Sequence, residues 1–432
     1  MALNNIFPNS IKNFGIKSLL SNQYMLAFFK KFCDEINNRM WRLKKARNAK
    51  YEKNDFLKVF FFSEIIGRSI HDASELLNEY YLSHKRGRRK IFADGRNKRL
   101  VPHQTEVNKF LRRIRLERAR NILRECVFYQ LKEAKDLNII SRKVNVLIDF
   151  TEHPYYGIRT DKMIKGTNRQ KGTTKMRHYL AFSILSRNTQ LFAGLEHVAG
   201  GQSKIPIILK FLDHLISEGF ELRYILMDRE FYRAALIDEV KRRGGNVLIP
   251  AKAYKTIKVI IAQYLQNKGA RVRKYMFSTA PGGKYRTFRQ VYLILNAKKG
   301  HSLLDVKRAF QKGALALDDA RKLIYAIMTT QKPRGRQHSW ASRTSRFYRK
   351  RWLIETGFSD LNRIHPRWKT NYDDVRYLDM LVRMLLYNSW KINKTIIKNY
   401  AKKEGKRKKW KLIQNQDYLK RLFLSLEKKS LG

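Results

Sequence analysis

The sequence predicts an α/β domain that lies between a helical N-terminal region and a helical, basic C-terminal region. Apolar residues recur at three- and four-residue steps up to about residue 131, short β-rich runs begin at Lys143, and helical spacing returns after residue 373. The chain has 432 residues, of which 43% are hydrophobic and 12% aromatic. This length and composition suit two or three domains with buried cores.

Residues 1–140 are predicted to form an all-helical domain. The segments NDFLKVFFFSEIIGR and SIHDASELLNEYYL, and the longer run that begins at HQTEVNKFLRR, place Leu, Ile and Phe at helical spacing. Asn54 and Ser69 are candidate N-caps, and Pro102 suits the start of a further helix.

Residues 141–252 and 322–372 are predicted to form the α/β domain. The strand-like runs VNVLIDF, HYLAFSILS and LFAGLEHVAG precede the helical run SKIPIILKFLDHLISEGF, the strand RYILMD, the helix REFYRAALIDEVKRRG and the strand NVLIPAK. This order of three strands, a helix, a strand, a helix and a strand is expected of a ribonuclease H-like fold.

Residues 253–321 are interpreted as a β-rich insertion into this domain. The run RKYMFSTAPGGKYRTFRQVYLILNAKKG is typical of a β-hairpin with a Pro-Gly-Gly turn, and LIYAIMTT, which follows the insertion, predicts one more buried strand. Residues 373–432 are expected to form a helical, basic C-terminal region. Four leucines of this region share one helical face and are expected to pack on the α/β domain: Leu378, Leu381, Leu385 and Leu386.

The charge of the chain predicts a polyanionic partner. Lys and Arg number 92 and Asp and Glu number 36, which gives a formal net charge of +56. This excess is far larger than solubility requires. The basic runs KRGRRK, FYRKRW and KKEGKRKKWK are spread along the chain, as suits a protein that touches DNA in several places.

The cysteine count and the absence of apolar segments predict a soluble, intracellular protein. Cys33 and Cys126 are the two cysteines, which is too few for a disulfide framework, so a reducing cytoplasm is expected. The start of the chain lacks a signal sequence, and no apolar run reaches the roughly 20 residues needed to span a bilayer.

The helical N-terminal region contains a candidate helix-turn-helix. The segments SIHDASELLNEYY and PHQTEVNKFLRRIR could supply its two helices, but the loop between them is long for this motif. A helical packing domain with a solvated basic face is the alternative. In the first interpretation four side chains of the second segment would face DNA: Gln104, Asn108, Arg112 and Arg113.

Three acidic residues lie where a two-metal phosphoryl-transfer site would need them. Asp149 lies near the end of VNVLIDF and Asp228 ends RYILMD, so both are expected at the C-terminal edge of the sheet, where ligands gather in α/β folds. Glu355 shares one helical face with Tyr348 and Arg351. Carboxylates can hold two Mg²⁺ ions that activate the attacking and leaving oxygens. An aspartate after a strand can equally form a turn or cap a helix.

The C-terminal motif resembles a family signature. Tyr348, Arg351 and Glu355 match the tyrosine, two residues, arginine, three residues, glutamate pattern of DDE transposases from bacterial and archaeal insertion sequences. The stretches DFTEHPYYG and MDREFY also resemble this class, and KGTTKMRHY is similar to an archaeal-type branch of it. The resemblance covers roughly residues 143–395. The family often has a lysine at position 362, where this chain has Asn362 followed by Arg363.

The resemblance implies a cut-and-join reaction on DNA. A metal-activated water would hydrolyse the strand at the end of the element, and the freed 3′-hydroxyl would attack target DNA. Asp149, Asp228 and Glu355 would be the catalytic residues and the ligands of two Mg²⁺ or Mn²⁺ ions. The implied partners are double-stranded DNA with terminal inverted repeats, target DNA and a second copy of the chain, in a prokaryotic cytoplasm at the nucleoid. A stand-alone nuclease and a non-enzymatic basic DNA-binding protein are the alternatives.

Basic and aromatic residues near the acids and in the helical region are expected to contact DNA. A cation beside a carboxylate can hold phosphate, and the stretch KMIKGTNRQKGTTK suits backbone contacts, although a solvated hairpin is equally open. The expected DNA-binding residues are Tyr348, Arg351, Arg229, Lys165, Lys171, Lys175, Arg112, Arg113 and Arg363.

Four neighbours of the acids are given other roles. Glu152 and His153 are expected in a surface turn, and Trp352 is expected in the core. Asp360 lies about 140° around the helix from Glu355 and is excluded from the site.

Overall fold

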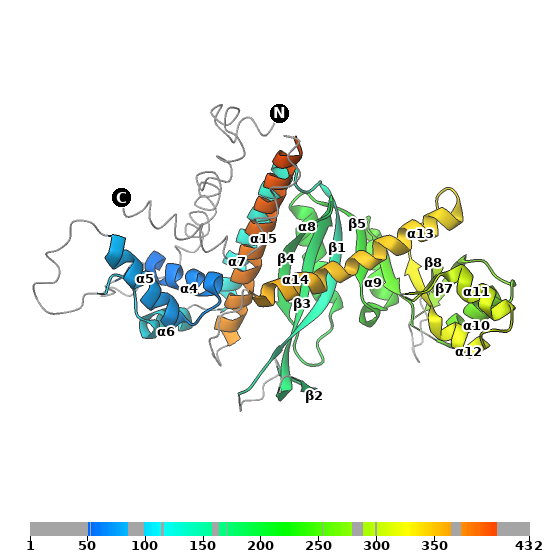
Figure 1. The fold of residues 1–432 in the computed structure, drawn as a ribbon, viewed down its shortest axis with the longest axis horizontal. Helices are drawn as coiled ribbons and strands as arrows, with labels where there is room; N and C mark the ends of the chain where they lie inside the picture. The colour runs from blue at the N-terminus through cyan, green and yellow to red at the C-terminus, as the bar shows by residue number, and fades with distance from the viewer. Residues whose placement is uncertain are drawn as a thin grey trace, which may run out of the picture.

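The described part of the chain forms three groups of elements along the long axis of the molecule (Figure 1). The computed structural model describes residues 51, 53–84, 99–113, 116–157, 164–170, 172–252, 254–278, 288–298, 300–363 and 373–403. Helices α4 to α6 lie at one end, the sheet with its covering helices lies in the middle, and helices α10 to α12 lie at the other end.

The N-terminal helices are α4 (Lys53–Ile66), α5 (Ile70–His84), α6 (Gln104–Arg112) and α7 (Leu116–Asp136). Ser69 caps α5 as predicted, because its hydroxyl accepts a hydrogen bond from the Asp72 N–H at 3.0 Å. Asn54 lies inside α4 and is not its N-cap. The predicted long helical run is two helices. Helix α6 packs with α4 and α5, whereas α7 packs on β4 and on α15 (Asp373–Lys403), so α7 covers the sheet.

Nine strands form one mixed sheet in the order β2-β3-β1-β5-β6-β9-β8-β7, with β4 also paired to β3. The strands are β1 (Lys143–Pro154), β2 (Ile164–Gln170), β3 (Thr173–Ser186), β4 (Thr189–His197), β5 (Glu221–Met227), β6 (Asn246–Pro250), β7 (Val272–Ser278), β8 (Phe288–Ala297) and β9 (Ile324–Thr329). The pairs β1–β5 and β5–β6 are parallel and the others are antiparallel. The part β4-β3-β1-β5-β6 is the predicted ribonuclease H-like arrangement, with β1 at its centre.

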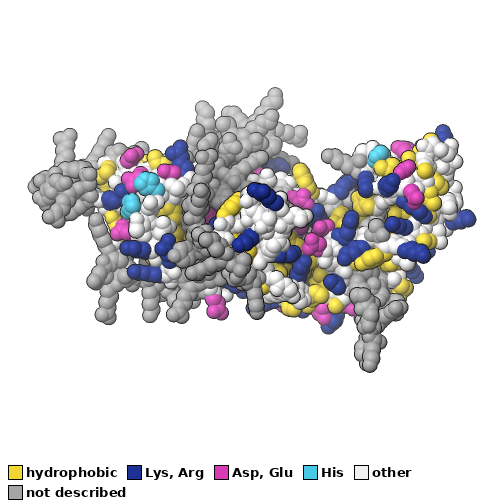
Figure 2. All heavy atoms as spheres, turned by 90° about the horizontal axis from the view of Figure 1, so that it is seen from below, with side chains coloured by type: hydrophobic (Ala, Val, Ile, Leu, Met, Phe, Trp, Pro, Cys, Tyr) yellow, Lys and Arg dark blue, Asp and Glu magenta, His cyan; other side chains and the backbone are white. Residues whose placement is uncertain are grey.

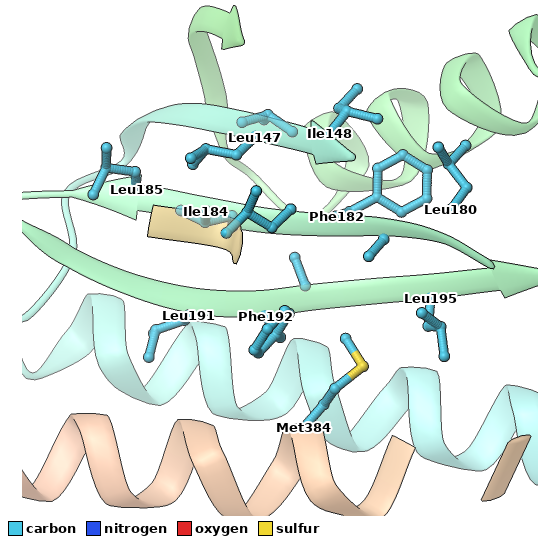
Figure 3. Packing of buried hydrophobic residues seen from close by; sticks show 14 of the residues in the cluster. Leu147, Ile148, Leu180, Phe182, Ile184, Leu185, Leu191, Phe192, Leu195 and Met384 are labelled. Carbon is cyan, nitrogen blue, oxygen red and sulfur yellow. The ribbon is translucent and has the colours of Figure 1, made fainter. Parts of the chain in front are cut away.

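Further helices cover this sheet, and the first two of them also connect its strands. They are α8 (Ile205–Ser217), α9 (Ala234–Arg242), α13 (Gln337–Tyr348), α14 (Trp352–Arg363) and α15. Figure 3 shows Leu191, Phe192 and Leu195 of β4 on the side of the sheet that faces α7 and α15, with Met384 of α15 directed toward them. The predicted packing of α15 on the α/β domain is confirmed, since all four leucines of its predicted face are buried.

The segment between β6 and β9 contains the predicted hairpin and three further helices. Strands β7 and β8 pair antiparallel from Val272↔Ile294 to Ser278↔Phe288, and the predicted Pro-Gly-Gly turn lies outside the described residues. Strand β8 also pairs with β9, so the hairpin continues the main sheet. The segment contains helices as well as strands. Its helices are α10 (Lys255–Leu265), α11 (Leu303–Gln311) and α12 (Leu317–Leu323). The β-branched residues of α10, KTIKVIIAQYL, obscure its helical spacing in the sequence.

None of the helices within the described ranges has both the length and the apolar character that a membrane crossing requires.

Candidate active site

Asp149 and Asp228 lie next to each other where the parallel pairing of β1 and β5 ends. Ile148 and Met227 form the last pair of that ladder, and Asp149 and Asp228 are the residues that directly follow them. Asp228 directly follows β5, as predicted. Asp149 lies inside β1 and not near its end, because β1 continues to Pro154 through its pairing with β3. Both carboxylates therefore lie at the same edge of the central strand pair.

A helical segment brings the third acid to this edge. Helix α13 ends at Tyr348, a 3₁₀ turn spans Arg349–Arg351, and α14 carries Glu355. Figure 1 shows α13 and α14 following one another across the sheet. Arg351 Nη1 donates to Asp149 Oδ2 at 2.5 Å, and Arg351 Nη2 donates to Glu355 Oε1 at 2.6 Å. Because both bonds come from one planar guanidinium, these carboxylate oxygens lie at most about 7 Å apart.

Tyr348 supports the backbone before Asp228. Its hydroxyl donates to the Met227 carbonyl at 3.3 Å, and only 8% of Tyr348 is exposed. Burial raises the pKa of the Tyr348 hydroxyl, so this group stays protonated as a donor. Tyr348 was expected to contact DNA, but in this structure its side chain faces the protein.

Gly357 sets how closely α14 approaches the sheet. A Cβ atom at this position would lie 2.8 Å from Gln190 Nε2 and 3.0 Å from Phe192 Cζ, both on β4. Only glycine permits this approach without a shift of neighbouring atoms, and the approach fixes the helix that carries Glu355. Gly357 was not predicted from the sequence, although a glycine inside a helical pattern is a signal of close packing.

The electrostatics of the site favour a bound cation. Burial raises the pKa of the Asp149 carboxyl to about 6, against the lowering effects of Arg351 and of the Phe150 N–H, and the charges of Asp228 and Glu355 raise it further. The Asp149 side chain is 13% exposed and that of Glu355 is 44% exposed. The three acids thus range from a nearly buried carboxylate to one that solvent reaches.

The donor set fits Mg²⁺ or Mn²⁺, which prefer carboxylate oxygen ligands. Among the described residues, one group of three possible metal ligands has atoms within 4.8 Å of one another, and it lies in the N-terminal helices. The oxygens of the three acids are therefore not all within that distance. The guanidinium of Arg351 stands between Asp149 and Glu355 and supplies the positive charge that a metal would supply there.

Of the remaining expected DNA contacts, Arg229 lies beside the acids and Lys165 lies farther along the sheet. Arg229 directly follows Asp228 and is exposed. Lys165 of β2 is exposed and pairs with Met176 of β3, which pairs with Pro154 of β1. This position is five residues along β1 from Asp149, or about 17 Å.

The other expected contacts are more distant or undescribed. Lys175 lies on β3 and is half-buried, and Arg112 and Arg113 are exposed at the end of α6. Lys171 and the side chain of Arg363 lie outside the described residues. The structure therefore brings Tyr348, Arg351 and Arg229 to the acids, but among the described residues it does not bring Lys165, Arg112 or Arg113 to them.

Two predictions for neighbouring residues are wrong. Trp352 is 64% exposed, because α14 packs through Ile354, Gly357 and Leu361 and leaves Trp352 on its outer side. Glu152 and His153 lie in β1 and not in a turn, since the ladder with β3 continues past Asp149.

Glu152 and Asp360 have charged or ionisable partners of their own. Glu152 Oε1 lies 3.2 Å from Nδ1 of His178. Asp360 is directed to Lys391 of α15, with Oδ2 3.7 Å from Nζ, which agrees with its exclusion from the site.

A ribonuclease H-like sheet thus carries Asp149 and Asp228 where its central parallel pair ends, with Glu355 of α14 joined to Asp149 through Arg351. Residues 141–389 match the family model described as transposase DDE domain. This match spans more than half of the 432 residues, and the chain belongs to the DDE transposase family. The matched region includes the insertion and the first half of α15. No curated protein matches the chain.

Proposed function

We propose that this transposase cuts DNA at the ends of its element and joins the ends to target DNA, with Asp149, Asp228 and Glu355 as the catalytic acids. The observation that supports it most is the meeting of Asp149 and Asp228 at the end of the β1–β5 ladder, with Glu355 linked to Asp149 through Arg351. Acids from three separate segments thus converge on one edge of the sheet.

The three carboxylates would hold two Mg²⁺ or Mn²⁺ ions, which supply activation of the attacking oxygen and stabilisation of the leaving oxygen when bound. Tyr348 fixes the backbone that carries Asp228, and Gly357 allows α14 to present Glu355. The low exposure of Asp149 keeps water away from one side of the site and strengthens its interaction with a cation.

Arg351 has two proposed roles. In the DNA-free protein its guanidinium holds the Asp149 and Glu355 carboxylates together. When metal ions occupy the acidic site, the guanidinium of Arg351 would be free to bind a phosphate of the DNA backbone. Its planar donor group can bind a phosphate through two hydrogen bonds. Arg351 would in this way couple the filling of the acidic site to the arrival of DNA.

The distribution of basic residues supports binding of double-stranded DNA over an extended surface. Figure 2 shows Lys and Arg side chains over the parts of the described chain visible on that face. We propose that Arg229 contacts DNA beside the acids, that Lys165 and Lys175 contact it along the β2–β3 hairpin, and that Arg112 and Arg113 contact the terminal repeat. A homodimer would hold two element ends together at the nucleoid.

An in vitro reaction tests this proposal. The full chain is incubated with Mg²⁺, a labelled duplex from the end of the element and a target plasmid, and nicked, hairpin and joined products are resolved. Asp228→Asn should reduce cleavage by at least about a hundredfold, because even the hydrogen-bond partners of metal ligands cost 10–100-fold when removed. Asp360→Asn is the matched control, since Asp360 pairs with Lys391, and it should keep cleavage.

The other possible outcomes of this assay distinguish the alternative functions. Cleavage without joining would indicate a stand-alone nuclease, and binding without products would indicate a DNA-binding protein. Cleavage that survives Asp228→Asn would contradict the assigned acids.

A further inference from the structure

Two histidines and a glutamate meet where helix α5 begins and helix α6 begins. His71 and Glu75 lie one turn apart on α5, and His103 is the N-cap residue of α6. One possible ligand atom of each residue lies within 4.8 Å of those of the other two. His71 is exposed and the other two residues are half-buried. Figure 2 shows a group of His side chains beside acidic ones on the N-terminal helical part.

We propose that His71, Glu75 and His103 form a second metal site, for a divalent transition-metal ion such as Zn²⁺. Two imidazoles and one carboxylate are a known ligand set for Zn²⁺, whereas Mg²⁺ prefers oxygen ligands alone. The exposure of His71 leaves room for water at a fourth position. The proposed site differs in ligand chemistry and in location from the three acids of the sheet.

Neighbouring side chains hold two of the ligands in place. In this structure His103 Nδ1 accepts a hydrogen bond from the Thr105 N–H at 3.4 Å and lies 3.1 Å from Thr105 Oγ1. With Nε2 on the ion, Nδ1 would carry the proton and would donate to this hydroxyl in place of accepting the cap bond. Arg99 Nη1 lies 2.8 Å from Glu75 Oε1, and Arg99 Nη2 donates to Ser74 Oγ at 2.8 Å. The Glu75 oxygen that Arg99 binds also faces His71, with Oε1 3.9 Å from His71 Nδ1, so an ion held there would compete with Arg99. The positive charge of Arg99 opposes a cation, so moderate affinity is expected.

A bound ion would fasten α5 to α6. These helices are separated in sequence by residues 85–103, and the ion would join the first turn of one to the N-cap of the other. Because binding to the folded state alone stabilises it, Zn²⁺ should raise the melting temperature of the protein. Helix α6 carries Arg112 and Arg113, so removal of the ion should also weaken any DNA contact made by that helix.

The test uses the full chain without an affinity tag, in an Asp149→Asn/Asp228→Asn background that removes the acidic site. Zn²⁺ binding is measured by calorimetry, and Co²⁺ is added as a spectroscopic probe of nitrogen ligation. His71→Ala, Glu75→Gln and His103→Asn should each weaken Zn²⁺ binding by at least about tenfold. His103→Asn keeps an acceptor at the N-cap, so the helix start is preserved. His301→Ala removes an exposed histidine elsewhere and is the matched control.

The parent chain is expected to bind one Zn²⁺ and to show a zinc-dependent rise in melting temperature. The three ligand variants should lose both properties, and the His301→Ala control should keep them. Circular dichroism without metal checks that each variant is folded, and the variants that fold decide the question. Absence of Zn²⁺ binding by the parent chain, or equal binding by folded variants, would overturn the proposal.

Discussion

The most informative single residue for the electrostatics of the site is Asp149. Burial is the main cause that raises the pKa of its carboxyl from 3.8 to about 6, so ionisation of this group costs stability in the metal-free folded protein. Between pH 3.8 and about 6 the Asp149 carboxyl is mostly protonated in the folded protein and mostly ionised in the unfolded chain. The stabilising effect of that proton is present at low pH and is lost as the pH rises through about 6.

Asp149→Asn should therefore stabilise the metal-free protein at pH 7.5 and leave its stability nearly unchanged at pH 3.5. A rise of about two pH units in the pKa corresponds to roughly 3 kcal/mol, which is an upper value for the gain. Chemical unfolding with a chelator present, at the two pH values, measures the difference between the variant and the wild type. An equal difference at both pH values would show that burial of the Asp149 charge is not its cause.

Substitution of Arg351 tests whether its guanidinium fills the space between Asp149 and Glu355 that a metal ion would occupy. Arg351→Gln should bind Mn²⁺ more tightly than the wild type in the absence of DNA, because the guanidinium no longer pairs with Asp149 and Glu355. The same variant should cleave DNA poorly, since it would lack the phosphate contact proposed for Arg351. Electron paramagnetic resonance of free Mn²⁺ measures the binding. Weaker Mn²⁺ binding by the variant would instead mean that Arg351 organises the acids for the metal.

At the scale of elements, the contact between α14 and β4 depends on Gly357. Gly357→Val would place side-chain atoms against Gln190 and Phe192, which are buried in β4. Overpacking of this kind costs about 1–3 kcal/mol, and here it would also displace Glu355. A lower melting temperature and a loss of cleavage are expected. Gly166→Val in β2 is the control for stability, since a Cβ there meets nothing within 4 Å, and its melting temperature should not change.

The order of strands and helices along the chain could be predicted from the sequence, but the extent of the strand pairing could not. The runs around VNVLIDF and RYILMD are apolar because the strands are central, and this predicted the edge at which Asp149 and Asp228 meet. The continuation of β1 past Asp149 could not be predicted, because residues Phe150 to Pro154 have mixed polarity and are held by pairing with β3. That pairing joins residues far apart in the sequence, so the spacing of apolar residues within one segment does not predict it.

At the scale of the whole molecule, a buried charge network joins the N-terminal helices to the catalytic part. Arg383 of α15 is fully buried, donates to Asp379 of the same helix, and has Nε 3.8 Å from Oε2 of the buried Glu64 of α4. Arg383→Met would remove the buried cation that faces these two acids and should cost about 3–5 kcal/mol.

Unfolding by urea measures the loss for Arg383→Met, and adding Glu64→Gln should restore part of the stability. Arg308→Met is the control, because Arg308 and Asp305 form an exposed pair at 3.9 Å. If Arg308→Met lowers stability as much as Arg383→Met does, burial is not the cause of the effect.

The net charge of +56 also belongs to the whole molecule. Binding to duplex DNA should weaken steeply with salt, because each neutralised phosphate releases a counterion and contributes a slope of about −0.9 to the logarithmic plot. A slope of about −5 or steeper is expected from titrations between low and physiological salt. A nearly flat response would contradict an extended contact with the DNA backbone.

The candidate site could be predicted in part because its acids lie at positions with a local signature. Tyr348, Arg351 and Glu355 have fixed helical spacing, and the structure keeps them on one side of α13 and α14. The bonds that Arg351 makes with two acids could not be predicted, since the same spacing suits a DNA contact. The exposure of Trp352 was missed because the packing side of α14 is set by the distant strand β4.

The measurement that tests the convergence of the three acids most directly is cleavage of the polypeptide by bound Fe²⁺. Fe²⁺ replaces Mg²⁺ in the full chain with DNA present, and ascorbate with peroxide generates radicals that cut the backbone near the ion. Cuts near Asp149, Asp228 and Glu355 are predicted, and excess Mg²⁺ should suppress all three together. If Mg²⁺-sensitive cuts are missing from any one of these segments, the three acids do not share one metal site.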